Sequence, residues 1–120
     1  MVNQPVDFTI PPGEAIAAVK LINPVNFGPA VLQGLMGPPI PHVRTLGQGT
    51  SPSLSFLIEH SSGRRLVWDL GIRKDWNNYA PKIANYIPGR NYTIEVEKNV
   101  IEILEDGGVK GDSIEAVIWR

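Results

Sequence analysis

Alternating apolar and polar positions mark the middle of the chain. Every second residue is strongly apolar in SLSFLIEH (53–60), which predicts a β-strand with one apolar face. The next four residues, SSGR (61–64), are typical of a tight turn, because Gly63 can adopt a positive φ. RLVWDLG (65–71) predicts a second strand that completes a β-hairpin. Its apolar residues fall on both faces, so we expect a central strand that is covered on both sides.

Helical periodicity comes after the hairpin. In NNYAPKIANYI (77–87), apolar residues three and four positions apart predict a helix with an asparagine as its cap and Pro81 in its first turn. The apolar stripe of VEKNVIEILEDGG (96–108) predicts a second, stronger helix that ends at one of its two glycines. The chain then turns and enters Ile114–Trp119, whose apolar residues predict a buried strand.

The first third of the chain is less regular. Residues 1–13 are polar and proline-bearing, and they predict a loose lead-in to a single domain formed by residues 14–120. Glu14–Ile22 fits a first strand, although its alanines leave a helix open. Residues 23–42 hold five prolines and three glycines, so we expect a long irregular loop. The order of strand, loop, hairpin, two helices and strand predicts the α/β (α+β) class with a mixed sheet.

Composition narrows the class of protein. The 120 residues include 12 acidic and 11 basic side chains, so the chain lacks the basic excess of nucleic-acid-binding proteins. It has no cysteine, which excludes disulfides and thiolate metal sites. We find neither a signal peptide nor the apolar run of a membrane-spanning helix, and we expect a cytoplasmic protein without a membrane partner. The basic pairs Arg64-Arg65 and Arg73-Lys74 are typical of plain solvated surface.

Three segments, taken in order, carry a family resemblance. They are LVWDLG (66–71), VIEILEDGGV (100–109) and DSIEAVIW (112–119). This succession resembles the N-terminal part of the metallo-β-lactamase superfamily, especially its fungal hydrolase-like members, over residues 14–119. The resemblance implies the N-terminal half of an αββα sandwich, an incomplete domain in which a mixed β-sheet carries two helices.

The metal ligands of that family have no counterpart in the sequence. In the family, the last of these strands leads directly into a loop of pattern His-x-His-x-Asp-His, the main metal-ligand motif. Here the chain ends at Arg120, and its two histidines, His42 and His60, form no such pattern. A zinc hydrolase site needs at least three nitrogen or oxygen ligands on a rigid frame. We therefore expect no metal or other cofactor in this chain, and zinc only in the complete family relative.

Asp69 is the one site residue that the resemblance assigns. It matches the first motif of the family, whose aspartate accepts hydrogen bonds from the backbone of the His-rich loop and supports the shape of that loop. Leu70 departs from the pattern, because family members usually carry Thr or Ser there. The alternative interpretation is that Asp69 is an ordinary turn residue at the end of a strand.

The sequence supports two functional hypotheses. In the first, the chain is the N-terminal fragment of a metal-dependent hydrolase, truncated just before the His-rich motif, and it is inactive alone. The complete relative would open an ester or lactone bond of a small molecule with metal-bound hydroxide. In the second, it is a stand-alone, non-catalytic binding module that uses the 23–42 loop. The apolar residues of that loop would form a wall for a ligand: Phe27, Leu32, Leu35 and Met36. The strand at 114–119 would expose an apolar edge that is open to self-association.

Overall fold

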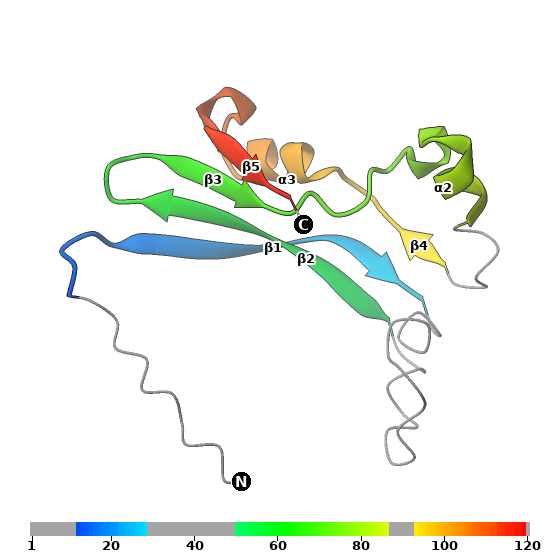
Figure 1. Cartoon of the computed structure of the whole chain (residues 1–120), viewed down its shortest axis with the longest axis horizontal. Helices are drawn as coiled ribbons and strands as arrows, with labels where there is room; N and C mark the ends of the chain where they lie inside the picture. The colour runs from blue at the N-terminus through cyan, green and yellow to red at the C-terminus, as the bar shows by residue number, and fades with distance from the viewer. Residues whose placement is uncertain (1–11, 29–49, 87–92, 120) are drawn as a thin grey trace, which may run out of the picture.

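The computed structural model of the chain describes residues 12–28, 50–86 and 93–119, and it contains a mixed five-stranded β-sheet (Figure 1). The strands lie in the order β4-β1-β2-β3-β5, and all neighbours are antiparallel except β3 and β5, which are parallel. The strands are β1 Ala17–Phe27, β2 Ser51–His60, β3 Arg65–Trp68, β4 Ile94–Glu95 and β5 Ala116–Ile118. The described residues also form α2 Pro81–Tyr86, α3 Val100–Asp106 and two 3-10 turns, Trp76–Asn78 and Gly111–Ser113. The predicted α/β class with a mixed sheet and two helices is confirmed.

The hairpin forms where the sequence predicts it, but its second strand is shorter. β2 and β3 pair antiparallel, and two backbone hydrogen bonds of 2.9 Å close the turn between them. Gly63 lies in this turn with a φ of +87°, a conformation that glycine adopts without strain. β3 ends at Trp68 and does not reach Gly71, because Asp69 leaves the extended conformation with a φ of +62°.

The first strand is longer than predicted. β1 covers Ala17–Phe27 and pairs with β2 and, at its far end, with β4, so the helical alternative for this segment is wrong. The expectation of an irregular loop is also wrong for residues 23–27, which belong to the strand. Pro24 is tolerated because the register of β1 against β2 shifts between Ile22 and Val25, and a bulge at that point needs no amide donor.

Both predicted helices form, and both are shorter than their sequence patterns. Pro81 is the first residue of α2, where its missing N–H costs no helical hydrogen bond. α3 begins after a capping box in which Asn99 and Glu102 satisfy each other's backbone groups. Gly107 is the C-cap residue of α3, as predicted. No helix in the described part of the chain is long and apolar enough to cross a membrane.

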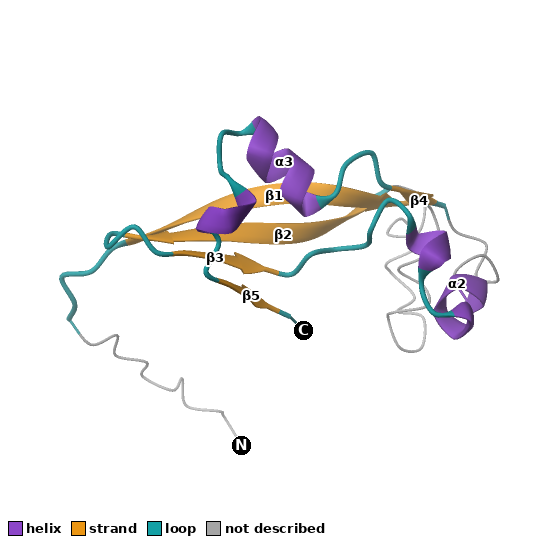
Figure 2. Ribbon diagram, turned by 90° about the horizontal axis from the view of Figure 1, so that it is seen from above, coloured by secondary structure: helices purple, strands orange, loops and turns teal. Residues whose placement is uncertain are grey.

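The hydrophobic core lies on one face of the sheet, under α3 (Figure 2). Ile22, Leu57 and Val67 come from β1, β2 and β3, and the strand register places all three on the same face. Val100 and Leu104 lie one turn apart on α3 and pack against them. Each of these five side chains is at most 6% exposed. Burial of an apolar side chain of this size contributes about 1.5–3 kcal/mol to the free energy of folding.

The opposite face of the sheet has no such cover within the described residues. β3 is central, as predicted, but Trp68 is 41% exposed, so the prediction that this strand is covered on both sides is wrong. The prediction of a buried strand at 114–119 is wrong as well. β5 is the edge strand, and Ile118 and Trp119 are 39% and 80% exposed. The reason is geometric: α3 packs on one face, while alternate residues of each strand point to the other.

Candidate functional site

The turn that comes after β3 is built around Asp69. Its backbone φ is +62°, and aspartate is one of the few residues besides glycine that visit this left-handed region. Its carboxylate Oδ1 accepts a hydrogen bond of 2.9 Å from the backbone N–H of Gly71. An aspartate that bonds to the backbone two residues later forms an Asx turn. The sequence Asp-Leu-Gly therefore encodes the change of direction at the end of β3.

Gly71 is required for two independent reasons. It has a φ of +60°, which disfavours residues with a Cβ atom. A Cβ atom built at this position would lie 3.0 Å from Pro24 Cγ and 3.0 Å from Val25 Cγ2. The turn after β3 thus packs closely against the bulge in β1, on the far side of β2.

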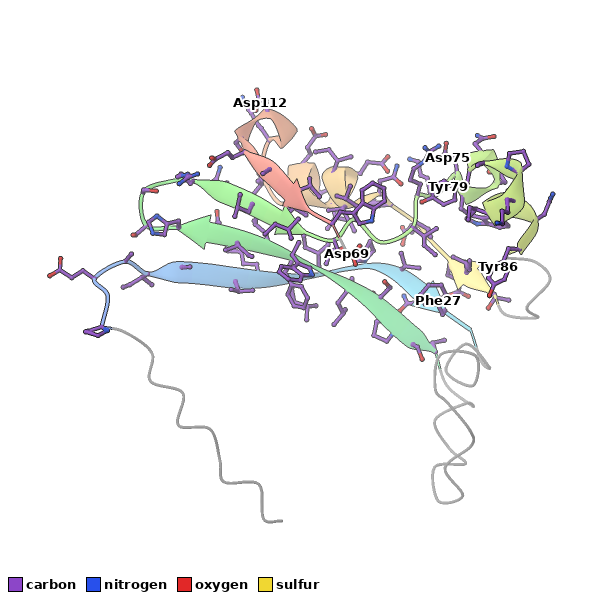
Figure 3. All side chains as sticks on the ribbon, viewed as in Figure 1. Phe27, Asp69, Asp75, Tyr79, Tyr86 and Asp112 are labelled. Carbon is purple, nitrogen blue, oxygen red and sulfur yellow. The ribbon has the colours of Figure 1, made fainter. Side chains whose placement is uncertain are left out.

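The turn also meets the end of β5. The backbone N–H of Asp69 donates a hydrogen bond of 2.9 Å to the carbonyl oxygen of Ile118. Trp68 and Ile118 are paired in the parallel ladder, so the carboxyl ends of β3 and β5 lie side by side. Figure 3 shows Asp69 at this junction, away from the labelled residues Phe27 and Tyr86. In open α/β sheets, ligands bind beyond the carboxyl ends of parallel strands.

Asp69 lies directly after β3, and the partner of its carboxylate among the described residues is local. The hydrogen bond to Gly71 is the bond that the ordinary-turn interpretation predicts. The supporting role, in which the carboxylate accepts hydrogen bonds from a His-rich loop, stays a prediction.

The loop between the turn and α2 holds an ion pair with an aromatic neighbour. Arg73 donates hydrogen bonds of 2.8 and 2.6 Å to the two carboxylate oxygens of Asp75. The Arg73 guanidinium also lies 5.2 Å from the centre of the Tyr79 ring, and the Tyr79 hydroxyl accepts a bond of 3.2 Å from the Arg73 backbone N–H. The hydrogen bond from Arg73 is the main reason that the pKa of Asp75 is lowered to about 2.

A second set of contacts joins the same loop to the start of α3. The backbone N–H of Lys74 donates a hydrogen bond of 2.9 Å to Asn99 Oδ1, and Lys74 Nζ lies 2.5 Å from Glu102 Oε1. The hydrogen bond from Lys74 lowers the pKa of Glu102. The sequence pattern of Arg73-Lys74 predicted plain solvated surface and missed these contacts. Asn99, which accepts the hydrogen bond from the Lys74 backbone N–H, is distant from Lys74 in sequence. The Asn-x-x-Glu capping pattern is the only sequence signal that marks Asn99.

The described residues do not bring metal ligands together. His60 is exposed at the hairpin turn, where its Nδ1 lies 2.7 Å from Ser62 Oγ, and His42 falls outside the described residues. Among residues 12–28, 50–86 and 93–119, no group of three His, Asp or Glu side chains could hold a metal ion. The donor set present here therefore does not fit a catalytic zinc ion.

The loop proposed for ligand binding is only partly described. Phe27 belongs to β1, while the other three residues of the expected apolar wall fall in segment 29–49, outside the described residues. The binding-module hypothesis therefore stays untested.

Three known proteins of fungal origin are similar to this chain. A gamma-lactamase of Fusarium pseudograminearum is 30% identical over 121 residues, which cover 96% of this chain and 29% of that protein. A metallo-hydrolase of Annulohypoxylon moriforme is 37% identical over 73 residues, which cover 58% of this chain and 19% of that protein. A cytochrome P450 monooxygenase of Penicillium roqueforti is 29% identical over 119 residues, which cover 96% of this chain and 13% of that protein.

The matched region is a small part of each relative. The chain spans less than a third of the length of the gamma-lactamase and still less of the other two proteins. The activities in their names therefore belong to much longer polypeptides. No family model matches the chain, and no solved structure matches it.

We expect Gly71→Ala to lower the free energy of unfolding by about 2–3 kcal/mol, because alanine would be strained by the positive φ and by the close approach of β1. Gly63→Ala is the matched control, since its φ is +87° but nothing lies within 4 Å of the added Cβ. That control should cost only about 1 kcal/mol. Urea denaturation followed by tryptophan fluorescence measures both. Equal losses would show that the contact with β1 adds nothing.

Asp69→Ala should lower the free energy of unfolding by about 1–2 kcal/mol, because it removes the acceptor for Gly71 N–H and places alanine in the left-handed region. Asp69→Asn keeps an acceptor oxygen and tolerates the same φ, so its effect should stay within about 0.5 kcal/mol. The same denaturation experiment applies. An asparagine variant as unstable as the alanine variant would mean that the negative charge is what the turn requires.

The pKa of Asp75 provides a test that depends on pH. NMR titration should give a pKa of about 2 for this carboxyl group, and Arg73→Gln should raise the pKa toward its ordinary value of 3.8. Because the folded-state pKa is depressed, the ion pair stabilises the fold above pH 3.8, and this stabilisation is lost as the pH falls toward 2. An unchanged pKa in the Arg73 variant would exclude the ion pair as the cause.

Proposed function

We propose that this chain, a metallo-β-lactamase-like segment, forms part of a metal-dependent hydrolase. The proposal is carried by the Asp69-Leu70-Gly71 turn, which lies beside the carboxyl end of β5. Two of the similar proteins described above, the gamma-lactamase and the metallo-hydrolase, have names that support a hydrolytic function.

The chemistry we propose is the opening of an ester, lactone or related cyclic amide bond in a small molecule. In hydrolases of this kind, a bound metal supplies an activated water at neutral pH. The described residues do not supply the ligands for such a metal, so we assign no step of the reaction to the chain by itself. Metal ligands in our proposal come from polypeptide beyond these 120 residues.

The contribution of this chain is to position the polypeptide that continues after β5. The hydrogen bond from Asp69 N–H to the Ile118 carbonyl fixes the carboxyl end of β5 against the end of β3. The Asp69 carboxylate accepts the Gly71 hydrogen bond through Oδ1, and a carboxylate has further lone pairs on Oδ2 that can accept another donor. A loop that continues from β5 would begin within reach of this carboxylate. In that arrangement the carboxylate would accept hydrogen bonds from the backbone of the loop, which is the supporting role expected for Asp69.

We expect the purified 120-residue chain to bind no stoichiometric zinc and to open no lactone or lactam ring, because it lacks three suitable ligands among its described residues. Equilibrium dialysis with metal analysis measures binding, and a chromogenic cyclic ester measures hydrolysis. His60→Ala is the control that detects weak zinc binding at the exposed histidine. Stoichiometric zinc together with hydrolysis that a chelator abolishes would contradict the proposal.

The mature transcript should continue in frame past the codon for Arg120 into a segment that encodes a His-x-His-x-Asp-His pattern. Sequencing the message across that codon tests this directly. A stop codon immediately after Arg120 in all mature messages would refute the hydrolase proposal for this protein.

A further inference from the structure

One buried polar side chain takes no part in the hydrogen bonds of the described residues. Ser55 on β2 is 0% exposed, and its hydroxyl oxygen has no hydrogen-bond partner in the described part of the chain. A buried hydroxyl that loses its bonds to water without gaining others destabilises a fold. Native proteins therefore contain few such groups, and each one needs a physical reason. An alanine at this position would fit the same space without that cost.

The strand register places Ser55 between the bulge in β1 and the turn after β3. On one side Ser55 pairs with Ile22, the last residue of β1 before the register shifts. On the other side the pairing of β2 with β3 ends at Phe56 and Trp68. The same register, continued by one residue, sets Ser55 opposite Asp69, which begins the turn.

The turn encloses Ser55 on the face of the sheet to which this serine points. Val25 pairs with Ser53, and residues two apart on a strand point to the same face, so Val25 and Ser55 share a face. A Cβ atom at Gly71 would lie 3.0 Å from Pro24 Cγ and from Val25 Cγ2, although β2 separates β1 from β3. The contact therefore passes over β2 beside Ser55, which explains the burial of this side chain.

The same turn holds an acceptor that is complementary to this donor. Asp69 uses its carboxylate Oδ1 for the hydrogen bond from Gly71 N–H. Its other oxygen, Oδ2, has no hydrogen-bond partner among residues 12–28, 50–86 and 93–119. Ionised acceptors form stronger hydrogen bonds than neutral ones, and a serine can turn its hydroxyl among three staggered rotamers. A donor without an acceptor and an acceptor without a donor thus occupy adjacent strand positions.

We propose that Ser55 is a positioning residue for Asp69, whose Oδ2 accepts a hydrogen bond from the Ser55 hydroxyl. The bond forms when the serine rotates toward β3, because no described acceptor bonds to the hydroxyl in its present rotamer. Gly71 then holds the carboxylate through one oxygen and Ser55 holds it through the other, so its orientation is fixed.

The importance of this bond for hydrolysis rests on the proposed function, in which the Asp69 carboxylate supports the loop that continues after β5. Each carboxylate oxygen can accept two hydrogen bonds, so Oδ2 keeps one lone pair for that loop. Ser55 itself, being buried, would act on the site only through Asp69.

A double-mutant cycle on the 120-residue chain tests the bond. Ser55→Ala should raise the equilibrium constant for unfolding about 3–10-fold in the unmodified chain, and it should not raise it in the Asp69→Ala variant, which lacks the acceptor. Urea denaturation followed by tryptophan fluorescence measures all four proteins. Ser53→Ala is the matched control, because Ser53 lies on the same face of β2 and is only partly buried, and its effect should stay below about 2-fold.

Amide hydrogen exchange separates positioning from general packing. Loss of the Ser55 hydroxyl frees the carboxylate, so the Gly71 amide should exchange at least ~3-fold faster in Ser55→Ala. The Gly63 amide, which donates a hydrogen bond of 2.9 Å to the His60 carbonyl in the hairpin turn, is the control and should keep its rate. A purely structural loss would change the exchange of both amides.

Two outcomes would overturn the inference. A Ser55→Ala variant that is as stable as the unmodified chain, or more stable, would show that the hydroxyl is unpaired. An equal loss of stability with and without Asp69 would assign the hydroxyl to another acceptor, such as a carbonyl group of the bulge in β1. Neither outcome decides the hydrolase proposal, which the transcript across the Arg120 codon tests, so the two can fail separately.

Discussion

The packing of α3 against one face of the sheet is the contact on which the rest of the fold depends. A parallel pair such as β3 and β5 cannot be joined by a hairpin, so the chain must leave the sheet and return through a crossover. α3 is the part of this crossover that enters the core, through Val100 and Leu104. The helix thereby holds the returning chain close to the sheet. The junction of Asp69 with Ile118 depends on that placement.

The parts of the fold that the sequence predicts well are those decided within a few residues. The hairpin needs only one alternating strand, a second apolar strand and a turn with Gly63, and α3 needs only its apolar stripe and a glycine at its end. The Asp69-Leu70-Gly71 turn is equally local, because the carboxylate bonds to an amide two residues away, but the strand was predicted to run through it to Gly71.

The parts that sequence reasoning missed depend on distant contacts. Residues 23–27 were expected to be irregular because segment 23–42 is rich in proline and glycine, yet pairing with β2 and β4 draws them into β1. Ile114–Trp119 was expected to be buried because it is apolar. The apolar character of a segment shows that the segment favours burial. It does not show whether the partner that would bury the segment lies among the described residues. The exposure of Trp68, Ile118 and Trp119 has this origin.

The alternation of β2 separates two kinds of position within one strand. Leu57 faces α3 and is 2% exposed, so changes there act on the free energy of unfolding. Its neighbour Ile58 points to the opposite face of the sheet, where no described helix packs. Asp69 belongs to neither surface, because its turn lies beyond the carboxyl end of β3. The residues that fold the sheet and the residues that shape the turn at its strand ends are therefore different.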